Sequence, residues 1–510
     1  MTEGISFEKE LWKACCRLRG SIESSQYKHV VLGLLFLKFI SDSYEEKREE
    51  LVKKISDKKD KLYTENEEDK KYILNDKDRY DFFIPEKARW SFLKLNAGQT
   101  DLPKKVDDAM QLIENVNKQL LGGLCPKIYL RIRIPYDALG ELINIFTKIE
   151  VGTKKGKEND TFGRVYEYFI KMFAMEEGRR GGEFYTPQSI VKLLVEILEP
   201  YKGRIFDPAC GSGGMFVQSL KFVKAHKGKK TDISIYGQES IDATWRLCNW
   251  NLIFRKIEGH IELGNTYWND KFSDLKADFI LANPPFNDSE WKREDTDADK
   301  RWIYGTVPNS NANYAWIQHF ITHLNNKGMA GFVLANGSLS VGGQEGEIRK
   351  KIIENDLVDC VVALPAQLFF TTQIPACLWF ITKNKGKRKG QTLFIDAREM
   401  FIKISRTQVE FSDEQVQKIA KTVKKYRGEL KGYKDIKGFC KKVKIKDVEK
   451  NNFILTPGRY VGFEDKEEEN KELFEEKMQK LTAELAEQFV ESEELQKKIK
   501  KNLRGIGFEF

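Results

Sequence analysis

The sequence predicts an α/β protein with a doubly wound, Rossmann-like sheet, an N-terminal α-helical domain and a C-terminal helical tail. Three observations predict it. Short β-like runs alternate with helical stretches from residue 203 onward, which favours a mostly parallel sheet. The first 150 residues instead carry helical periodicity, and the last 48 show apolar residues at heptad-like spacing. We therefore expect domains at 1–150 and 151–462 and a helical segment at 463–510.

Composition limits the class of protein. The chain has 510 residues, 41% hydrophobic and 12% aromatic, enough for a sizeable core. Its net charge of +9 favours a polyanionic partner, but only weakly. The eight cysteines contain no CxxC pair, which indicates a reducing, cytoplasmic setting without zinc. No signal peptide is visible, and the apolar window 29–40 contains Lys38 and is too short to span a membrane.

The N-terminal half is organised around helices. Residues 5–57 and 105–149 have apolar positions on one face, whereas 58–80 are rich in Lys, Asp and Glu and predict a solvated turn region. The segment VGTKKGKEND at 151–160 is polar and glycine-containing, so we place a linker there.

The central region alternates between element types. Two helices are expected, at 162–177 and 188–200, the second begun after Pro187 and ended by Pro200. The expected strands are 203–207, 234–239, 260–265, 278–283, 329–336, 358–365 and 377–383. Ligands of a doubly wound sheet sit at the carboxyl ends of its strands, so the residues that follow each apolar run matter most.

The first strand end reads FDPACGSGGM, residues 206–215. Gly211, Gly213 and Gly214 allow a tight turn and close approach of a ligand to the backbone, ahead of a helix N-terminus. The dinucleotide fingerprint would need glycine at the position of Phe216, so an NAD site fits poorly. A nucleoside-type ligand without a pyrophosphate fits better. A merely structural turn is the alternative, and Asp207 with the following proline weighs against it.

The next two strand ends carry polar side chains. Glu239 follows Asp207 by one helix and one strand, and a carboxylate there can accept hydrogen bonds from two ribose hydroxyls. Asn265 ends the third run, where its amide would read an adenine edge or simply make a turn.

The fourth strand ends in Asn283, Pro284, Pro285 and Phe286. An exocyclic amino group is a poor nucleophile because its lone pair is delocalised into the ring. The Asn283 side-chain oxygen and the Pro284 carbonyl can accept both N–H groups and direct that lone pair at a methyl donor. Proline fixes the chain direction, and the Phe286 ring offers a stacking face for an extruded base. A structural Asn-Pro-Pro turn is the alternative reading of this tetrapeptide alone.

The pairing of FDPACGSGG with NPPF resembles S-adenosylmethionine-dependent amino-group DNA methyltransferases of the N6-adenine type. Further stretches resemble the modification (M) subunit of type I restriction–modification systems over nearly the whole chain. They are residues 11–46, GGEFYTPQ (181–188), 311–324, 369–383, TLFIDAREM (392–400) and TPGRYVG (456–462). Cys210 departs from the family, in which small residues are common at that position.

The resemblance implies a function and its partners. It implies methyl transfer from S-adenosylmethionine to N6 of a flipped adenine in double-stranded DNA, with two M subunits per DNA-specificity (S) subunit and a restriction (R) subunit in the full complex. The cofactor pocket would include Glu183, Phe184, Tyr185, Thr186, Pro187, Gln188, Asp207, Ser212, Gly213, Gly214, Glu239 and Asn265; Asn283 to Phe286 would be catalytic. The C-terminal helix would dock on the S subunit or on the N-terminal domain.

Other functions compete with this one. Release-factor glutamine methyltransferases use a similar motif but are shorter, and cytosine-N4 methylation poses the same chemical problem. A non-catalytic scaffold would have no use for the intact tetrapeptide. His319 and His323 are four residues apart without an HExxH pattern, so we interpret them as structural, with no metal site. The charged loop 287–309 is expected to close over DNA or to order when DNA binds.

Overall fold

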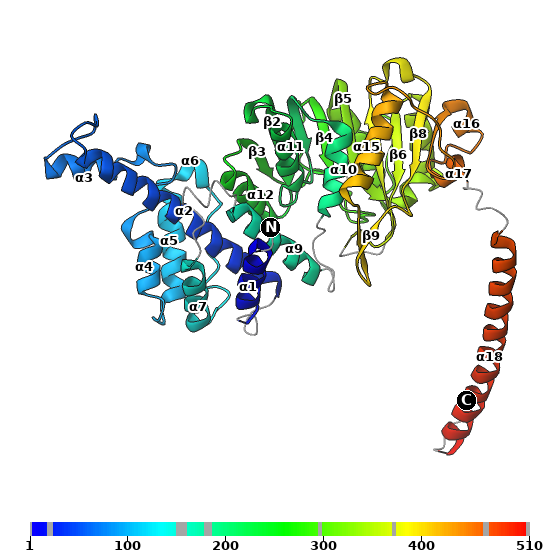
Figure 1. Ribbon diagram of the computed structural model, residues 1–510, viewed down its shortest axis with the longest axis horizontal. Helices are drawn as coiled ribbons and strands as arrows, with labels where there is room; N and C mark the ends of the chain where they lie inside the picture. Colours follow the sequence, from blue (N-terminus) through cyan, green and yellow to red (C-terminus); the bar gives the residue numbers. More distant parts are fainter. Residues whose placement is uncertain are drawn as a thin grey trace.

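The computed structural model describes residues 3–17, 24–148, 161–177, 186–293, 298–369, 374–462 and 469–505. A helical N-terminal part, a sheet-containing part and one long C-terminal helix follow one another along its longest axis (Figure 1). The expected linker at 151–160 lies outside the described residues. No helix among the described residues is both long and apolar enough to cross a bilayer.

The N-terminal part is built around α2, a 33-residue helix whose run from Val30 to Leu37 is largely buried. Position 33 within this run favours glycine, because a Cβ there would meet the Tyr129 hydroxyl at 2.7 Å. The helices are α1 (Glu3–Arg17), α2 (Ser24–Ser56), α3 (Glu67–Asn75), α4 (Trp90–Leu95), α5 (Leu102–Val116), α6 (Lys118–Leu121) and α7 (Tyr136–Thr147). Helical structure was expected at both 5–57 and 105–149, and these segments hold α1, α2 and most of α5 to α7.

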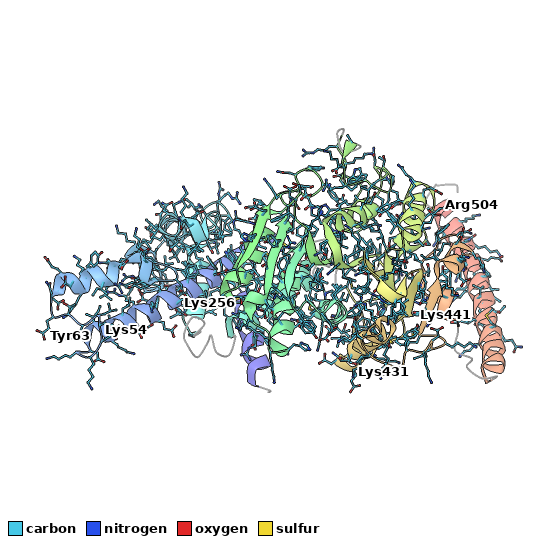
Figure 2. All side chains as sticks on the ribbon, turned by 90° about the horizontal axis from the view of Figure 1, so that it is seen from above. Lys54, Tyr63, Lys256, Lys431, Lys441 and Arg504 are labelled. Atoms are coloured by element: carbon cyan, nitrogen blue, oxygen red, sulfur yellow. The ribbon has the colours of Figure 1, made fainter. Side chains whose placement is uncertain are left out.

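The expectation of a turn region at 58–80 was partly wrong, because α3 lies within it. The Asn66 side chain accepts a hydrogen bond from the Glu68 N–H at 2.8 Å and caps the helix. No α3 residue is buried, so an amphipathic pattern could not have predicted this helix. Lys54 and Tyr63 mark this far tip of the molecule (Figure 2).

The sheet has nine strands in the order β11-β8-β6-β7-β5-β4-β1-β2-β3. Strand β1 pairs in parallel with β2 on one side and with β4 on the other. Strands β2 and β3 therefore lie on one side of β1, and β4 lies on the other side. The topological switch point, where doubly wound sheets bind ligands, is between β1 and β4. The strands are β1 (Gly203–Asp207), β2 (Ile233–Glu239), β3 (Gly259–Leu263), β4 (Ala277–Ala282), β5 (Leu324–Ala335), β6 (Val358–Ala363), β7 (Ala376–Thr382), β8 (Gln391–Asp396) and β11 (Cys440–Lys444).

The predicted fold class is confirmed, and the sheet is mixed at one side. All seven expected strands are present, but β7 runs antiparallel to both neighbours and β11 runs antiparallel to β8. The lysine-rich β11 is an edge strand with only Cys440 and Val443 buried. Its sequence therefore lacks the apolar pattern by which the other strands were predicted. A separate hairpin joins β9 (Ile402–Ser405) and β10 (Gln408–Glu410).

Helices cover both faces of the sheet (Figure 1). One apolar cluster joins the sheet to α10 (Gln188–Leu198), α11 (Gly214–Ala225), α12 (Asp242–Phe254) and α15 (Asp413–Arg427). Another joins the opposite face to α13 (Asn313–His323), α14 (Gly343–Glu354), α16 (Ile445–Glu449) and α17 (Gly458–Val461). The central strands are thus covered on both faces, and their carboxyl ends are where polar side chains meet solvent.

The helical part and the sheet part share one apolar core. Phe36 of α2 stacks on Trp250 of α12 with ring centroids 5.0 Å apart. Phe162 of α9 (Thr161–Glu177) packs on Phe254 of α12 at 3.9 Å. Helices α9 and α12 therefore hold the N-terminal part against the sheet part, next to the ends of β1 and β2.

Helix α18 (Glu469–Gly505) projects away from the sheet part (Figure 1). Its described side chains are almost all exposed, including the apolar ones at 478, 481, 485 and 489. The predicted C-terminal helical tail is therefore present, with its apolar side chains exposed to solvent.

Candidate active site

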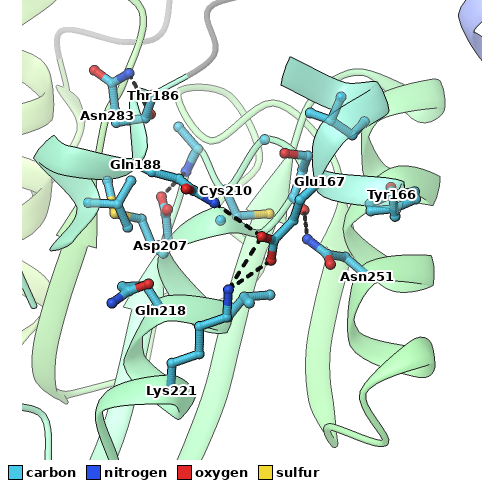
Figure 3. A pocket seen from close by; sticks show the side chains of 18 residues that line it. Tyr166, Glu167, Thr186, Gln188, Asp207, Cys210, Gln218, Lys221, Asn251 and Asn283 are labelled. Atoms are coloured by element: carbon cyan, nitrogen blue, oxygen red, sulfur yellow. Dashed lines mark hydrogen bonds and ion pairs between the residues drawn. The ribbon is translucent and has the colours of Figure 1, made fainter. Parts of the chain in front are cut away.

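Two adjoining cavities lie at the carboxyl ends of β1, β2 and β4. The glycine-loop cavity, about 90 Å³, is lined by α9, α10, α11 and the loop after β1 (Figure 3). The strand-end cavity, about 250 Å³, is lined by that loop, the residues that follow β2, β3 and β4, and parts of α2, α9 and α13. Five residues line both cavities: Ile170, Ala209, Gly211, Ser212 and Asn283.

The glycine-rich turn after β1 packs against helix α12. Gly211 and Gly213 have φ values of 54° and 79°, which favour glycine, and Gly213 is the N-cap of α11. The Ser212 carbonyl accepts a hydrogen bond from the Asn251 amide at 2.8 Å. Gly211, Ser212 and Gly214 line the glycine-loop cavity. Gly213 lines neither; a Cβ there would meet the Cys248 sulfur at 2.9 Å.

Two buried carboxylates flank this turn. Glu239, at the end of β2, accepts hydrogen bonds from the Gly211 N–H at 3.0 Å and the Ile241 N–H at 2.9 Å, and it lines the strand-end cavity. Asp207, at the end of β1, accepts from the Ala209 N–H at 3.0 Å and lines the glycine-loop cavity. Burial, reinforced by the nearby Glu239, raises the pKa of Asp207 well above its usual value.

Asn283 lies where the two cavities meet. Its Nδ2 donates to the Thr186 Oγ1 at 2.9 Å, which fixes the orientation of the amide (Figure 3). Its Oδ1 is buried and has no hydrogen-bond partner among the described residues. A buried acceptor without a donor costs free energy, on the order of 1–3 kcal/mol, so the site is poised for a ligand with an N–H or O–H group.

The rest of the tetrapeptide is arranged unevenly. Pro285 lines the strand-end cavity, whereas Pro284 is buried and Phe286 half-buried, and neither lines a cavity. The Phe286 ring packs edge-on against Phe369 at 5.8 Å. The second proline and the asparagine thus face the cavities most directly.

The segment expected to form one cofactor wall is only partly described. Glu183, Phe184 and Tyr185 lie outside the described residues. Thr186 and Gln188 line the glycine-loop cavity, and the buried Pro187 is the N-cap of α10 without lining it. Asn265 lines the strand-end cavity.

Several cavity residues were missed from the sequence. Glu167 of α9 accepts hydrogen bonds from Gln188 and Lys221, both at 3.1 Å (Figure 3). It also accepts from Arg255 at 2.7 Å. Lys28 reaches the strand-end cavity from α2 and is only 6% exposed. Glu167 and Lys28 each lie beside an apolar helical run, and the sequence did not indicate which distant residues they would meet.

Arg301 holds the wall of the strand-end cavity. It donates to the carbonyl oxygens of Thr266 at 2.8 Å and Tyr267 at 2.6 Å, and it is paired with Asp299. It also lies 3.0 Å from His319 Nδ1. The charged loop 287–309 therefore contributes a fixed support to the site, and Trp291 and Trp302 of the same loop are buried.

His319 and His323 are buried beside Asp270, and one ligand atom of each of the three lies within 4.8 Å of the others. Burial, with the neighbouring His323 and Arg301, lowers the pKa of His319 well below its usual value. The Arg301 N–H groups can only donate, so they occupy the His319 lone pair and place a positive charge where a cation would bind. This arrangement favours the structural interpretation of the pair.

Comparisons with known proteins identify the family of this chain. The N-6 DNA Methylase family model matches residues 157–469, and the HsdM N-terminal domain model matches residues 7–146. The chain belongs to the N-6 DNA methylase family, among the methylase subunits of type I restriction enzymes. It is 42% identical to the MjaIX methylase subunit of Methanocaldococcus jannaschii, over 98% of this chain and 92% of that one. It is 45% identical to the HindI methylase subunit of Haemophilus influenzae, over 84% of this chain and all of that one.

The fold of this methylase subunit is also found in a solved structure. The methyltransferase subunit of a type I restriction–modification system from Streptococcus thermophilus superposes with a TM-score of 0.75 at 23% identity. The match covers 90% of this chain and 99% of that one. The resemblance inferred from the sequence is therefore confirmed, and the competing assignment to a shorter glutamine methyltransferase is excluded.

Proposed function

We propose that this chain transfers a methyl group from S-adenosylmethionine to N6 of an adenine flipped out of double-stranded DNA, as the modification subunit that protects host DNA from cleavage. The observation that carries the proposal is the buried Oδ1 of Asn283, which has no hydrogen-bond donor among the described residues and whose orientation is set by Thr186. An exocyclic amino group would donate a hydrogen bond to this oxygen.

The cavities fit the proposed cofactor chemically. Glu239, at the end of β2, lines the strand-end cavity, and its carboxylate can accept hydrogen bonds from a ribose diol. Burial, with the nearby Glu239, raises the pKa of Asp207 well above its usual value, and the cationic amino acid end of the cofactor would favour the ionised form of this carboxyl. The glycine turn adds no side chain that would block either group. When bound, the cofactor supplies an electrophilic methyl group on a sulfonium.

The tetrapeptide would activate the amino group of the base. Asn283 Oδ1 accepts one N–H, and the carbonyl oxygen of Pro284 accepts the other. Both acceptors draw the nitrogen lone pair out of conjugation and hold it toward the methyl carbon. Phe286 would stack on the extruded base, a contact worth roughly 1–3 kcal/mol. Extrusion is required because the amino group of a paired adenine is not accessible in the duplex.

The assembly we propose contains two copies of this chain on one DNA-specificity subunit, with a restriction subunit added for cleavage. A complex-assembly structure of a type I system has the same fold, with a TM-score of 0.63 at 20% identity. The exposed apolar side chains of α18 at 478, 481 and 485 are the surface offered to a partner helix. The positive net charge of +9 is compatible with DNA.

The decisive test is transfer of labelled methyl from S-adenosylmethionine to DNA by the chain combined with its specificity subunit. We expect Asn283→Ala to abolish transfer while binding of S-adenosylhomocysteine, measured by calorimetry, changes little. Asn355→Ala, which alters an exposed asparagine after α14, is the matched control and should transfer normally. Full transfer by the Asn283 variant would refute the proposal.

A further inference from the structure

Two thiols lie in contact beneath the glycine-rich turn. Cys210 belongs to the turn after β1, and Cys248 lies on α12, 38 residues later in the chain. Their sulfur atoms are 3.8 Å apart. Both side chains are buried, with exposed fractions of 5% and 0%, and both are free thiols. The fold thus brings two distant cysteines together directly under the backbone of the site.

Of these two thiols, Cys210 is the one that faces the glycine-loop cavity. It is among the residues that line this cavity (Figure 3), whereas Cys248 lines neither cavity. The cavity measures about 90 Å³, and a single water molecule needs roughly 10–15 Å³. A molecule of the size of hydrogen peroxide therefore fits in it and meets Cys210 before Cys248.

Burial keeps the pair unreactive toward other thiol reagents. Burial, reinforced by the contact with Cys248, raises the pKa of Cys210 well above its usual value. The thiolate is the reactive form of cysteine, so oxidation of Cys210 is slow and requires an oxidant small enough to enter the cavity. A ligand that fills the cavity excludes that oxidant.

A bond between the two sulfurs requires a small local movement. A disulfide holds its sulfur atoms about 2.0 Å apart, so the present separation must shrink by about 1.8 Å. Helix α12 is firmly anchored on the other side. The Trp250 indole N–H donates to the Leu124 carbonyl at 3.0 Å, and the Leu247 carbonyl accepts from the Tyr166 hydroxyl at 2.7 Å. The movement therefore falls mainly on the turn.

The turn transmits such a movement to the cavity. The Cys210 N–H donates to the Gln238 carbonyl at 3.0 Å, and the Cys210 carbonyl accepts from the Gly213 N–H at 2.9 Å. The next residue, Gly211, donates its N–H to the Glu239 carboxylate at 3.0 Å. A pull on the Cys210 sulfur strains these three hydrogen bonds and displaces the backbone that lines both cavities.

We propose that Cys210 and Cys248 are an oxidation site, at which a peroxide that enters the empty glycine-loop cavity joins the two thiols in a disulfide and thereby abolishes cofactor binding. The deprotonated Cys210 sulfur attacks one peroxide oxygen and the O–O bond breaks. The departing hydroxide takes up the Cys210 proton, so a sulfenic acid and one water form.

The Cys248 sulfur closes the bridge. It attacks the sulfenic sulfur, the S–O bond breaks, and the Cys248 proton leaves with the hydroxide as a second water. Two thiols and one hydrogen peroxide give one disulfide and two waters, and the two electrons lost by the sulfurs reduce the peroxide. Disulfides in reducing compartments are transient, so a small thiol such as dithiothreitol reverses the change. The inference rests on the proposed function only for the identity of the ligand that is released.

Peroxide treatment of the full chain tests the site, with peptide mass spectrometry to detect the bridge and calorimetry with S-adenosylhomocysteine to measure its effect. We expect a linked peptide that contains Cys210 and Cys248, an affinity at least about 10-fold weaker, and full recovery after dithiothreitol. Prior addition of S-adenosylhomocysteine should slow formation of the bridge. Cys125→Ser, which changes a buried thiol of the N-terminal part, is the matched control and should respond as the wild type does.

Cys248→Ala separates the bridge from oxidation of one thiol. Before treatment it should bind S-adenosylhomocysteine as the wild type does, and peroxide should produce no linked peptide and little loss of affinity. A loss as large as that of the wild type would show that the bridge is not the cause and would overturn the inference. Absence of the linked peptide in the wild type, or a linked peptide without weaker binding, would overturn it as well. Failure of the reduced wild type to bind S-adenosylhomocysteine would instead count against the proposed function, and the bridge would still be detected by its mass.

Discussion

The Thr186 hydroxyl lies 2.9 Å from the Asn283 Nδ2 and thereby decides which end of that amide faces the cavities. Thr186→Val removes the acceptor while keeping the shape of the side chain, so the amide is free to rotate. We expect the turnover number for DNA methylation to fall roughly 10- to 100-fold, since small errors of alignment have effects of that size. Thr186→Ser keeps the hydroxyl and should stay near wild type. Equal turnover by the valine and serine variants would remove Thr186 from the mechanism.

Glu239 accepts hydrogen bonds from the backbone around the glycine turn and is the carboxylate that we propose for the ribose of the cofactor, so removal of its charge should weaken cofactor binding. In Glu239→Gln, an NH₂ group must face one of the two backbone N–H donors, of Gly211 or Ile241. We expect the dissociation constant for S-adenosylhomocysteine to rise about 10- to 100-fold by calorimetry. Glu262→Gln, on the exposed part of β3, is the control and should bind as wild type does.

The sequence predicted the strand ends well because their signals are local. The expected run 203–207 is β1 itself, and Glu239 and Asn283 lie at the ends of β2 and β4 as anticipated. The glycine and proline residues that follow these runs restrict the backbone whatever the tertiary context. Glu167 and Lys28 were not predicted, because they reach the cavities through packing between elements distant in sequence.

The same reasoning explains the elements that were missed. Strand β11 is recognised only when it pairs with β8, since its three Lys residues otherwise resemble a solvated segment. No residue of α3 is buried, so its N-cap residue, Asn66, indicates the helix better than its hydrophobic pattern does. The role of Arg301 likewise depends on Thr266 and Tyr267, some 35 residues earlier in the chain.

Arg301 should support both stability and cofactor binding. Arg301→Met keeps the aliphatic volume but leaves the buried carbonyl oxygens of Thr266 and Tyr267 without their donor. We expect the free energy of unfolding to fall by about 2–4 kcal/mol and cofactor affinity to fall with it. Lys300→Met, next to it and exposed, is the control for chemical denaturation and calorimetry. Unchanged stability of the Arg301 variant would mean that its contacts are not maintained in solution.

Buried His319 should make stability depend on pH. Burial, His323 and Arg301 hold its pKa well below 6.5, so the folded protein binds no proton there. The unfolded chain does bind one below about pH 6.5, which stabilises the unfolded state. The contribution of His319 is therefore complete above pH 6.5 and is lost as the pH falls, by up to about 1.4 kcal/mol per pH unit.

Urea denaturation between pH 7.5 and 5.5 measures this effect. His319→Gln keeps an acceptor for Arg301 but cannot titrate, so its free energy of unfolding should fall less steeply with acid than that of the wild type. His260→Gln, at an exposed position of β3, should keep the wild-type slope. Identical slopes for wild type and the His319 variant would show that His319 is protonated in the folded state.

Helix α18 presents an apolar surface that the described chain leaves uncovered. Leu481 and Leu485 are 50% and 49% exposed and lie on one side of the helix, four residues apart. Each loses about 1.5–3 kcal/mol of transfer free energy by staying in water, which a partner helix would recover. We expect Leu481→Glu with Leu485→Glu to abolish co-purification with the DNA-specificity subunit. Binding of S-adenosylhomocysteine should persist, because α18 contributes nothing to either cavity. A charge change on the polar side, Lys480→Glu, should leave assembly intact. Assembly that survives the double substitution would place the contact with the specificity subunit on another surface.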